Sequence, residues 1–239
     1  MSLPTPGPVP LPTPAGVPLG TPGLIAVAAV IGLVAGSYAR ALAAGFRDEA
    51  GDHREEARSA FLAAVRAVPV PRRPYVLEAA TAAAAALVAW QVRDGWVLAA
   101  WLYAVAAGAA LAAVDWRTWR LPDAITLPSY PILLALLAPS GRLLAAVAAA
   151  CALAAVYAVL WFARPTGLGL GDVKLAGIIG LVAGALGVQA TITAGMAGYL
   201  FGAVYAVGLL LTRRATRGSE FPFGPFMLAG ALAAVFVPG

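Results

Sequence analysis

The sequence has very little of the chemistry on which most soluble enzymes rely. It contains one cysteine, Cys151, and one histidine, His53, among 239 residues. A single cysteine excludes an internal disulfide and a cysteine-rich zinc site. A lone histidine among charged loop residues is typical of a solvated side chain rather than of a metal ligand, and no H-E-x-x-H motif occurs. We expect Cys151, which lies within an apolar run, to be a buried packing residue.

Charge is also scarce. Charged residues make up 11% of the chain and hydrophobic residues 62%, with a mean hydropathy of +0.86. This composition is too apolar for a soluble domain and is typical of a helical membrane protein that spans the bilayer several times. No series of roughly ten-residue alternating segments occurs, which argues against an outer-membrane barrel. The net charge of +5 does not predict nucleic-acid binding, because basic residues in membrane proteins mark the cytoplasmic loops.

The chain divides into three parts. Residues 1–23 are rich in Pro and Gly and carry no charged side chain, which predicts a disordered tail. This tail is not a typical signal peptide, since no Lys or Arg precedes Arg40. Residues 24–75 are predicted to form the first membrane helix and a short cytoplasmic loop. Residues 76–239 are predicted to form a membrane domain of seven further helices.

Two features of the second part leave alternatives open. Gly32 and Gly36 form a G-x-x-x-G pair in the first span, which indicates either close helix contact or simply the small-residue composition of an Ala-rich helix. In the loop, residues 55–68 have apolar side chains such as Phe61 and Val65 at helical spacing. This pattern predicts a short amphipathic helix that lies either on the membrane or on the protein.

Three long apolar blocks follow, and each is about twice the roughly 20 residues that one crossing requires. The blocks are residues 76–114, 124–163 and 175–212. Each has a break near its middle, at residues 93–95, 139–141 and 187–189. Each also has basic residues at both ends, which requires an even number of crossings under the positive-inside rule. We therefore expect three helical hairpins and, with the first and last spans, an all-α fold of about eight transmembrane helices.

The distribution of basic residues predicts the orientation. Of the 16 Lys and Arg residues, only Arg93 and Arg142 fall outside the cytoplasm in this arrangement. The positive-inside rule then places both termini on the extracytoplasmic side. Four acidic residues fall near the cytoplasmic boundary of helices, namely Glu78, Asp115, Asp123 and Asp172.

An ionisable residue at a membrane boundary is a functional-site hypothesis by default. Asp115 ends one predicted span and Asp172 begins another, so the two can meet in the bundle. Two carboxyl groups in one site share a proton and titrate with two separated macroscopic pKa values. The ionised member can then activate a water while the protonated member hydrogen-bonds the substrate carbonyl. Such a pair needs no metal and no nucleophilic side chain.

Each of these residues also has a purely structural interpretation. Asp115 can pair with a neighbouring arginine at the interface. Asp123 is well placed to cap a helix that starts near Ala124, and Asp172 to cap the helix after it. Lys174 can extend to the membrane surface without a partner.

Motifs in three parts of the chain resemble those of the prepilin peptidases, also called type IV leader peptidases, which are GxGD-type aspartic proteases of the membrane. They are Gly-Leu-Gly-Asp-Val-Lys at 169–174, Asp-Trp-Arg-Thr-Trp-Arg-Leu-Pro-Asp at 115–123, and Phe-Pro-Phe-Gly-Pro-Phe at 221–226. Residues 73–78, Arg-Pro-Tyr-Val-Leu-Glu, are a looser echo of a fourth motif. The resemblance extends from about residue 72 to the end of the chain.

This resemblance implies an endopeptidase that removes the basic leader peptide of type IV prepilins or pseudopilins. It implies a location in the bacterial cytoplasmic membrane, with the active site at the cytoplasmic face and Asp115 and Asp172 as the catalytic pair. By the same resemblance, Gly169 and Gly171 would leave room for substrate backbone beside Asp172. Lys174 would be a supporting charge, and Asp123 a structural or secondary carboxylate.

The resemblance is weaker in the first third of the chain. Many family members carry two C-x-x-C pairs that bind zinc in the first cytoplasmic loop, and they methylate the new N-terminus with S-adenosylmethionine. Residues 45–75 contain no Cys, so we expect neither zinc nor S-adenosylmethionine as a cofactor. The sequence therefore predicts a peptidase alone or a divergent bifunctional enzyme. Its expected partners are the leader peptide and the lipid bilayer, without nucleic acid.

An ion-coupled transporter is the alternative from another class. In such a protein the Asp residues would bind protons or cations. Transporter sites usually lie near the bilayer midplane, at broken helices in repeated halves. Here the carboxylates are predicted at one boundary and no internal repeat is evident, which favours the peptidase.

Overall fold

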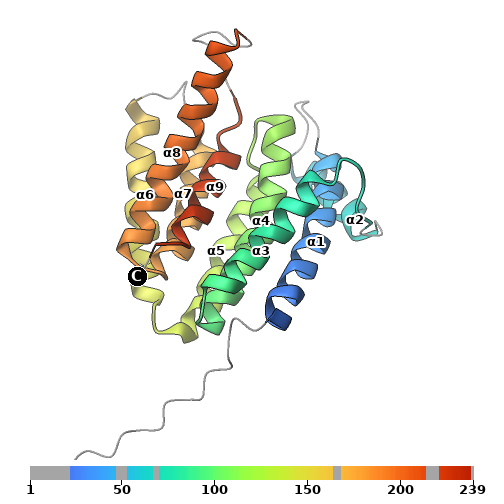
Figure 1. Ribbon diagram of the computed structural model, residues 1–239. Helices are drawn as coiled ribbons and strands as arrows, with labels where there is room; N and C mark the ends of the chain where they lie inside the picture. Colours follow the sequence, from blue (N-terminus) through green and yellow to red (C-terminus); the bar gives the residue numbers. More distant parts are fainter. Residues whose placement is uncertain (1–21, 47–52, 67–69, 164–167, 214–220, 238–239) are drawn as a thin grey trace, which may run out of the picture.

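The computed structural model describes residues 22–46, 53–66, 70–163, 168–213 and 221–237, and over these residues the regular secondary structure is entirely helical (Figure 1). The predicted all-α class is confirmed. Most of the predicted tail at residues 1–23 lies outside the described residues. The helices are α1 (Pro22–Gly45), α2 (His53–Arg66), α3 (Val76–Gln91), α4 (Gly95–Thr118), α5 (Asp123–Leu137), the 3-10 turn η1 (Ala138–Ser140), α6 (Leu143–Ala163), α7 (Leu170–Gly184), α8 (Val188–Leu211) and α9 (Gly224–Ala234).

The three predicted pairs of consecutive helices are present, as α3 with α4, α5 with α6 and α7 with α8, and local chemistry explains each break. Between α3 and α4, the Asp94 carboxylate accepts hydrogen bonds from the backbone N–H groups of Trp96 and Val97, at 2.9 and 3.0 Å, and so caps α4. The other two hairpins turn at glycines with positive φ, Gly141 at +71° and Gly187 at +135°. Residues with a Cβ rarely adopt such angles, so these glycines allow the chain to reverse.

The apolar helices differ in length, and only some of them are long enough to span a bilayer. Within the described residues, four helices are long and apolar enough to span a bilayer, namely α1, α4, α6 and α8. Helices α5 and α7 have 15 residues each, which corresponds to about 22 Å at 1.5 Å per residue. Helix α7 lies against α4, α5, α6, α8 and α9, and most of its residues are buried. It therefore lies in the interior of the bundle.

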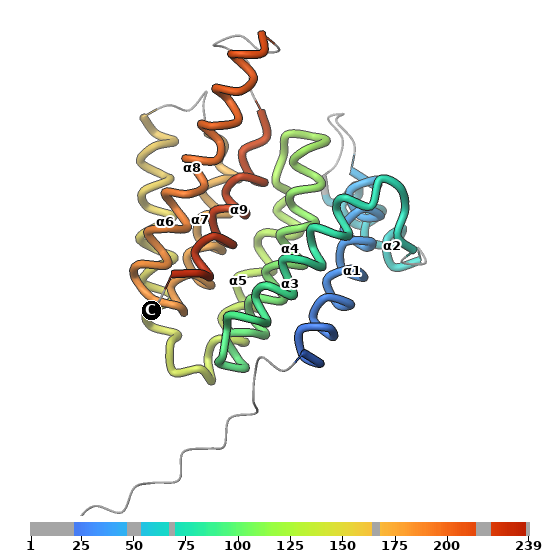
Figure 2. The backbone as a smooth tube through the Cα atoms, viewed as in Figure 1, coloured from blue at the N-terminus to red at the C-terminus, as the bar shows by residue number. Residues whose placement is uncertain are grey.

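Two glycines bring α1 close to α3. A Cβ at Gly32 would come within 2.5 Å of the carbonyl oxygen of Thr81, and a Cβ at Gly36 within 2.7 Å of the Cα of Glu78. The G-x-x-x-G pair of α1 is thus a contact with α3, which decides between the two interpretations of the sequence. Figure 2 shows α1, α3 and α4 on one side of the molecule and α6 and α8 on the other.

The predicted amphipathic helix does not pack through the face that carries its large apolar residues. Helix α2 buries Ala57, Ala60 and Ala64. Ala60 packs directly on Gly45 of α1, since a Cβ added to Gly45 would be only 2.7 Å from the Ala60 Cα. The larger Phe61 and its neighbours Leu62 and Val65 are exposed. Helix α2 therefore lies on α1 through its alanines, which permit a close approach, and turns its bulky side chains outward.

The prediction that Cys151 is buried is wrong. The side chain is exposed on the surface of α6. Helix α6 is apolar around its whole circumference, so hydropathy does not distinguish the face toward lipid from the face toward the bundle.

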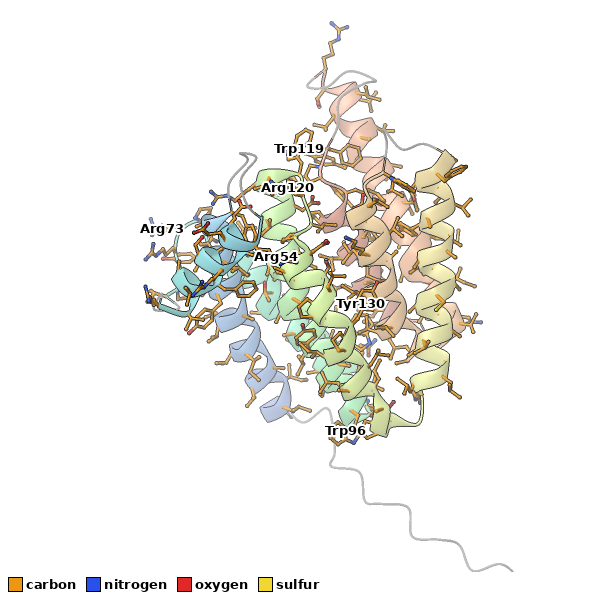
Figure 3. The ribbon with its side chains drawn as sticks, turned by 180° about the vertical axis from the view of Figure 1, so that it is seen from behind. Arg54, Arg73, Trp96, Trp119, Arg120 and Tyr130 are labelled. Atoms are coloured by element: carbon orange, nitrogen blue, oxygen red, sulfur yellow. The ribbon has the colours of Figure 1, made fainter. Side chains whose placement is uncertain are left out.

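The two ends of the bundle differ. In Figure 1, α1 begins and α9 ends at the lower end, whereas α4 ends and α7 and α9 begin at the upper end. Figure 3 shows Trp96 at the lower end, with Trp119 and Arg120 in the upper part. Asp115, in the last turn of α4, and Asp172, in the first turn of α7, therefore lie at the same end of the molecule.

Candidate active site

Asp115 is held at the point where α4 meets α9. The residue is 5% exposed, and its Oδ2 accepts a hydrogen bond of 2.9 Å from the backbone N–H of Gly224. Helix α4 ends three residues later, and Trp119 follows in the left-handed conformation with φ of 55°. Its N–H donates to the carbonyl oxygen of Asp115 at 2.8 Å. The carboxylate therefore sits on the last turn of one helix and at the N-terminus of another.

Asp172 is held by the start of its own helix. It is 8% exposed, and its Oδ2 accepts a hydrogen bond of 2.9 Å from the backbone N–H of Gly169, the N-cap residue of α7. The N–H of Asp172 in turn donates to the carbonyl oxygen of Gly169 at 3.1 Å. The suggested capping role is thus correct in kind, but the carboxylate acts from the third helical position, like the acidic member of a capping box.

The segments that carry the two buried carboxylates meet at a common neighbour. Leu121, in the turn between α4 and α5, lies against both of their segments. A Cβ at Gly171 would be 2.9 Å from the Leu121 Cβ, and a Cβ at Gly224 would be 3.5 Å from the Leu121 Cδ2. The fold therefore brings Asp115 and Asp172 together from distant parts of the chain, and Gly171 provides the space that Leu121 needs.

Lys174 and Asp123 form an ion pair beside this site. The Lys174 Nζ lies 2.5 Å from the Asp123 Oδ1, and the side chains are 35% and 57% exposed. The prediction that Asp123 caps α5 is wrong, because the helix begins at Asp123 itself and Pro122 occupies the N-cap position. The chain thus uses this carboxylate to connect α5 with α7. An exposed pair of this kind contributes about 0–1 kcal/mol to stability.

Three tyrosines near Asp172 were not identified from the sequence. The Tyr130 hydroxyl donates a 2.7 Å hydrogen bond to the carbonyl oxygen of Lys174, and Figure 3 shows its place in the bundle. Tyr157 and Tyr199 lie within electrostatic range of Asp172. Their ring centroids are 5.2 Å apart. Tyrosines are common in apolar helices, so no local signal distinguished these from ordinary packing residues.

Glu78, the fourth acidic residue predicted at the boundary, has a separate partner. It is 1% exposed and accepts two hydrogen bonds from the guanidinium of Arg40, from Nε at 2.7 Å and from Nη2 at 2.5 Å. The same Nη2 donates to the carbonyl oxygen of Pro74 at 2.7 Å. This ion pair joins α1 to α3.

Across the residues that the structure describes, no group of three His, Cys, Asp or Glu side chains is arranged to hold a metal ion. The expectation of a metal-free site remains a prediction.

These features define a polytopic helical membrane protein with two buried carboxylates at one end of its bundle. Residues 96–207, which include Asp115 and Asp172, match the model of the type IV leader peptidase family. This region of the chain therefore belongs to that family, and the resemblance noted from the motifs is confirmed.

Individual relatives give the same result. The prepilin leader peptidase/N-methyltransferase of Aeromonas salmonicida is 32% identical over 169 residues, which cover 66% of this chain and 56% of that protein. The proteins of the same name from Aeromonas hydrophila and Pseudomonas aeruginosa are 32% and 29% identical, over 69% of this chain and 59% and 58% of their own lengths. The chain thus spans a little over half the length of these relatives. No solved structure matches.

Proposed function

We propose that this protein is a membrane aspartic endopeptidase that removes the basic leader peptide of type IV prepilins or pseudopilins. The observation that carries the proposal is the buried pair of Asp115 and Asp172 within a region of the type IV leader peptidase family. The position of both carboxylates at helix ends, rather than midway along the helices, favours a peptidase over an ion-coupled transporter.

The chemistry follows from two carboxyl groups that share one proton. The ionised carboxylate removes a proton from a water molecule, and the water oxygen attacks the carbonyl carbon of the scissile peptide bond. The protonated carboxyl donates a hydrogen bond to the carbonyl oxygen, which becomes negative as the carbon becomes tetrahedral. Collapse of this intermediate breaks the C–N bond, and the carboxyl group that took the proton from water donates a proton to the leaving nitrogen. The backbone N–H groups of Gly169 and Gly224 hold the two carboxylates in place meanwhile.

We further propose that the protein lies in the bacterial cytoplasmic membrane, with the site at the cytoplasmic face and both termini on the opposite side. The excess of basic residues predicted for the loops on the side of the site supports this orientation. The beginning of α1 and the end of α9 lie at the end of the bundle away from the site, which is consistent with it (Figure 1).

The proposal is tested by co-expression with a type IV prepilin in a host that lacks its own prepilin peptidase. We expect the wild-type protein to convert the prepilin to a shorter form, seen as a gel shift, with mass spectrometry locating the new N-terminus at the end of the basic leader. The matched control is the same host with empty vector. An intact prepilin beside a membrane-inserted, folded protein would contradict the assigned substrate class.

Activity should depend on pH on both sides of an optimum. Protonation of both carboxyl groups at acid pH removes the base, and ionisation of both at alkaline pH removes the hydrogen-bond donor. The rate of leader cleavage, measured in detergent micelles with a purified substrate, should therefore fall in both directions. A rate that stays constant between about pH 4 and about pH 9 would contradict the shared-proton mechanism.

Removal of metal should leave leader cleavage unchanged. The proposed mechanism uses only the two carboxylates and water, and the loop at residues 45–75 contains no Cys. We expect the same initial rate before and after dialysis against EDTA, with and without added zinc, and no requirement for S-adenosylmethionine. A loss of activity that zinc restores would contradict the prediction.

A further inference from the structure

Gly224 is the one residue from outside α4 with a hydrogen bond to Asp115 among those that the structure describes. It begins α9, lies 109 positions away in the sequence, and donates its backbone N–H to the Asp115 Oδ2 at 2.9 Å in a buried setting. Asp172, in contrast, finds its N–H donor only three residues away, at Gly169. The position of Asp115 therefore depends on how a separate helix is docked.

The contact also requires a glycine. A Cβ at position 224 would lie 2.8 Å from the Asp115 Oδ2 and 3.4 Å from its Cγ. A Cβ atom essentially never comes as close as 2.8 Å to another side-chain atom. A side chain at this position would push the carboxylate away from the place in which the N–H holds it.

Aromatic residues fix the start of α9 on α8. The ring of Phe223 lies 5.1 Å from that of Tyr199, and a Cβ at Gly202 would be 2.8 Å from the Phe223 ring. Two residues beyond Gly224, the ring of Phe226 lies 4.9 Å from that of Tyr205. The residues on both sides of Gly224 are thus anchored to the same helix, which sets the position of its N–H.

We propose that Gly224 is a positioning residue for the reaction: it holds Asp115 in the orientation that lets it share a proton and a water with Asp172, and the aromatic contacts between α8 and α9 hold Gly224. The inference rests on the proposed peptidase function. It assigns to the Phe-Pro-Phe-Gly-Pro-Phe segment at 221–226 the task of placing a carboxylate that another helix carries.

The first test is Gly224→Ala in the full-length protein, with kcat and KM measured for prepilin cleavage. We expect kcat to fall by roughly 100-fold, the loss that follows when a reacting group is misplaced by about 1 Å, while KM changes by less than about twofold. Gly208→Ala is the matched control, because a Cβ at Gly208 meets nothing within 4 Å. A wild-type kcat in Gly224→Ala, or a raised KM with kcat unchanged, would overturn the proposal.

Phe223→Leu decides the matter if Gly224→Ala does not accumulate as folded protein. This variant keeps an apolar side chain but removes the ring that packs on Tyr199. We expect a smaller fall in kcat, on the order of tenfold, again with KM unchanged. No change in kcat would contradict the anchoring part of the proposal.

A second measurement needs no catalysis, so it separates this inference from the proposed function. Hydrogen exchange is measured on the peptide that contains residues 221–226, in which Pro222 and Pro225 contribute no amide. In Asp115→Ala the Gly224 amide loses its acceptor and its deuterium uptake should rise, whereas Asp172→Ala should raise uptake at Gly169 instead. Unchanged uptake at Gly224 in Asp115→Ala would overturn the inference even if the wild type cleaves prepilin. If the wild type cleaves nothing but the exchange pattern is as expected, only the peptidase function fails.

Discussion

Asp115→Asn and Asp172→Asn should each reduce leader cleavage by roughly 10⁴- to 10⁶-fold, the range found when one member of a catalytic triad is removed. Asparagine has the shape of aspartate but cannot take a proton from water at neutral pH. The shared proton of the pair is therefore lost with either substitution. Because the two residues act as a unit, the double variant should be little worse than either single variant.

The local structure should survive these substitutions. The amide oxygen of asparagine can still accept the N–H of Gly224 at position 115 or the N–H of Gly169 at position 172. We therefore expect both variants to insert into the membrane and to unfold close to the wild-type temperature. A loss of activity that accompanies a loss of folded protein would not support the catalytic role.

Asp94→Asn is the matched control for this experiment. Asp94 lies at the opposite end of α4 and accepts hydrogen bonds from two backbone N–H groups at the N-terminus of that helix. Asparagine is also a good N-cap residue, so cleavage should remain at the wild-type rate. More than about a tenth of the wild-type rate in either Asp115→Asn or Asp172→Asn would contradict the two-carboxylate mechanism.

The sequence predicted the parts of the fold that depend on local patterns. The hairpins follow from apolar runs whose breaks contain a capping aspartate, Asp94, or a glycine with positive φ such as Gly187. The meeting of Asp115 and Asp172 at one end follows from the alternation of helix direction. These features are readable because each depends on where the helices begin and end, which residues that are neighbours in the sequence determine.

Contacts between distant residues were not predictable in the same way. No local pattern indicates that the N–H of Gly224 reaches Asp115 or that the Tyr130 hydroxyl reaches α7. Hydropathy also fails where both lipid and protein are apolar. For this reason the sequence wrongly predicts a buried Cys151 and does not indicate that α2 packs through its alanine face.

The largest effect on stability is expected from Arg40→Ala. This substitution leaves the carboxylate of Glu78, which is 1% exposed, without the two hydrogen bonds that it accepts from Arg40. Removal of one partner of a buried ion pair destabilises a protein by about 3–5 kcal/mol, because the remaining charge is buried with little compensation. For Glu78, the hydrogen bond that remains from another residue is a long one of 3.5 Å from the Arg72 N–H. We expect a loss of this size in the free energy of unfolding, measured by denaturant titration in detergent micelles.

The two partners should not be equivalent. The Arg40 side chain is 29% exposed, and a long basic side chain can extend its charge to water. Glu78→Ala should therefore destabilise the protein less than Arg40→Ala, and adding Glu78→Ala to Arg40→Ala should restore part of the lost stability. Lys174→Ala is the matched control from an exposed pair, with an expected loss below about 1 kcal/mol. If Glu78→Ala cost as much as Arg40→Ala, or if the double variant were the least stable of the three, the buried carboxylate would not be the source of the penalty. The coupling energy obtained from the wild type, the two single variants and the double variant would then have to be assigned to the contact between α1 and α3 as a whole.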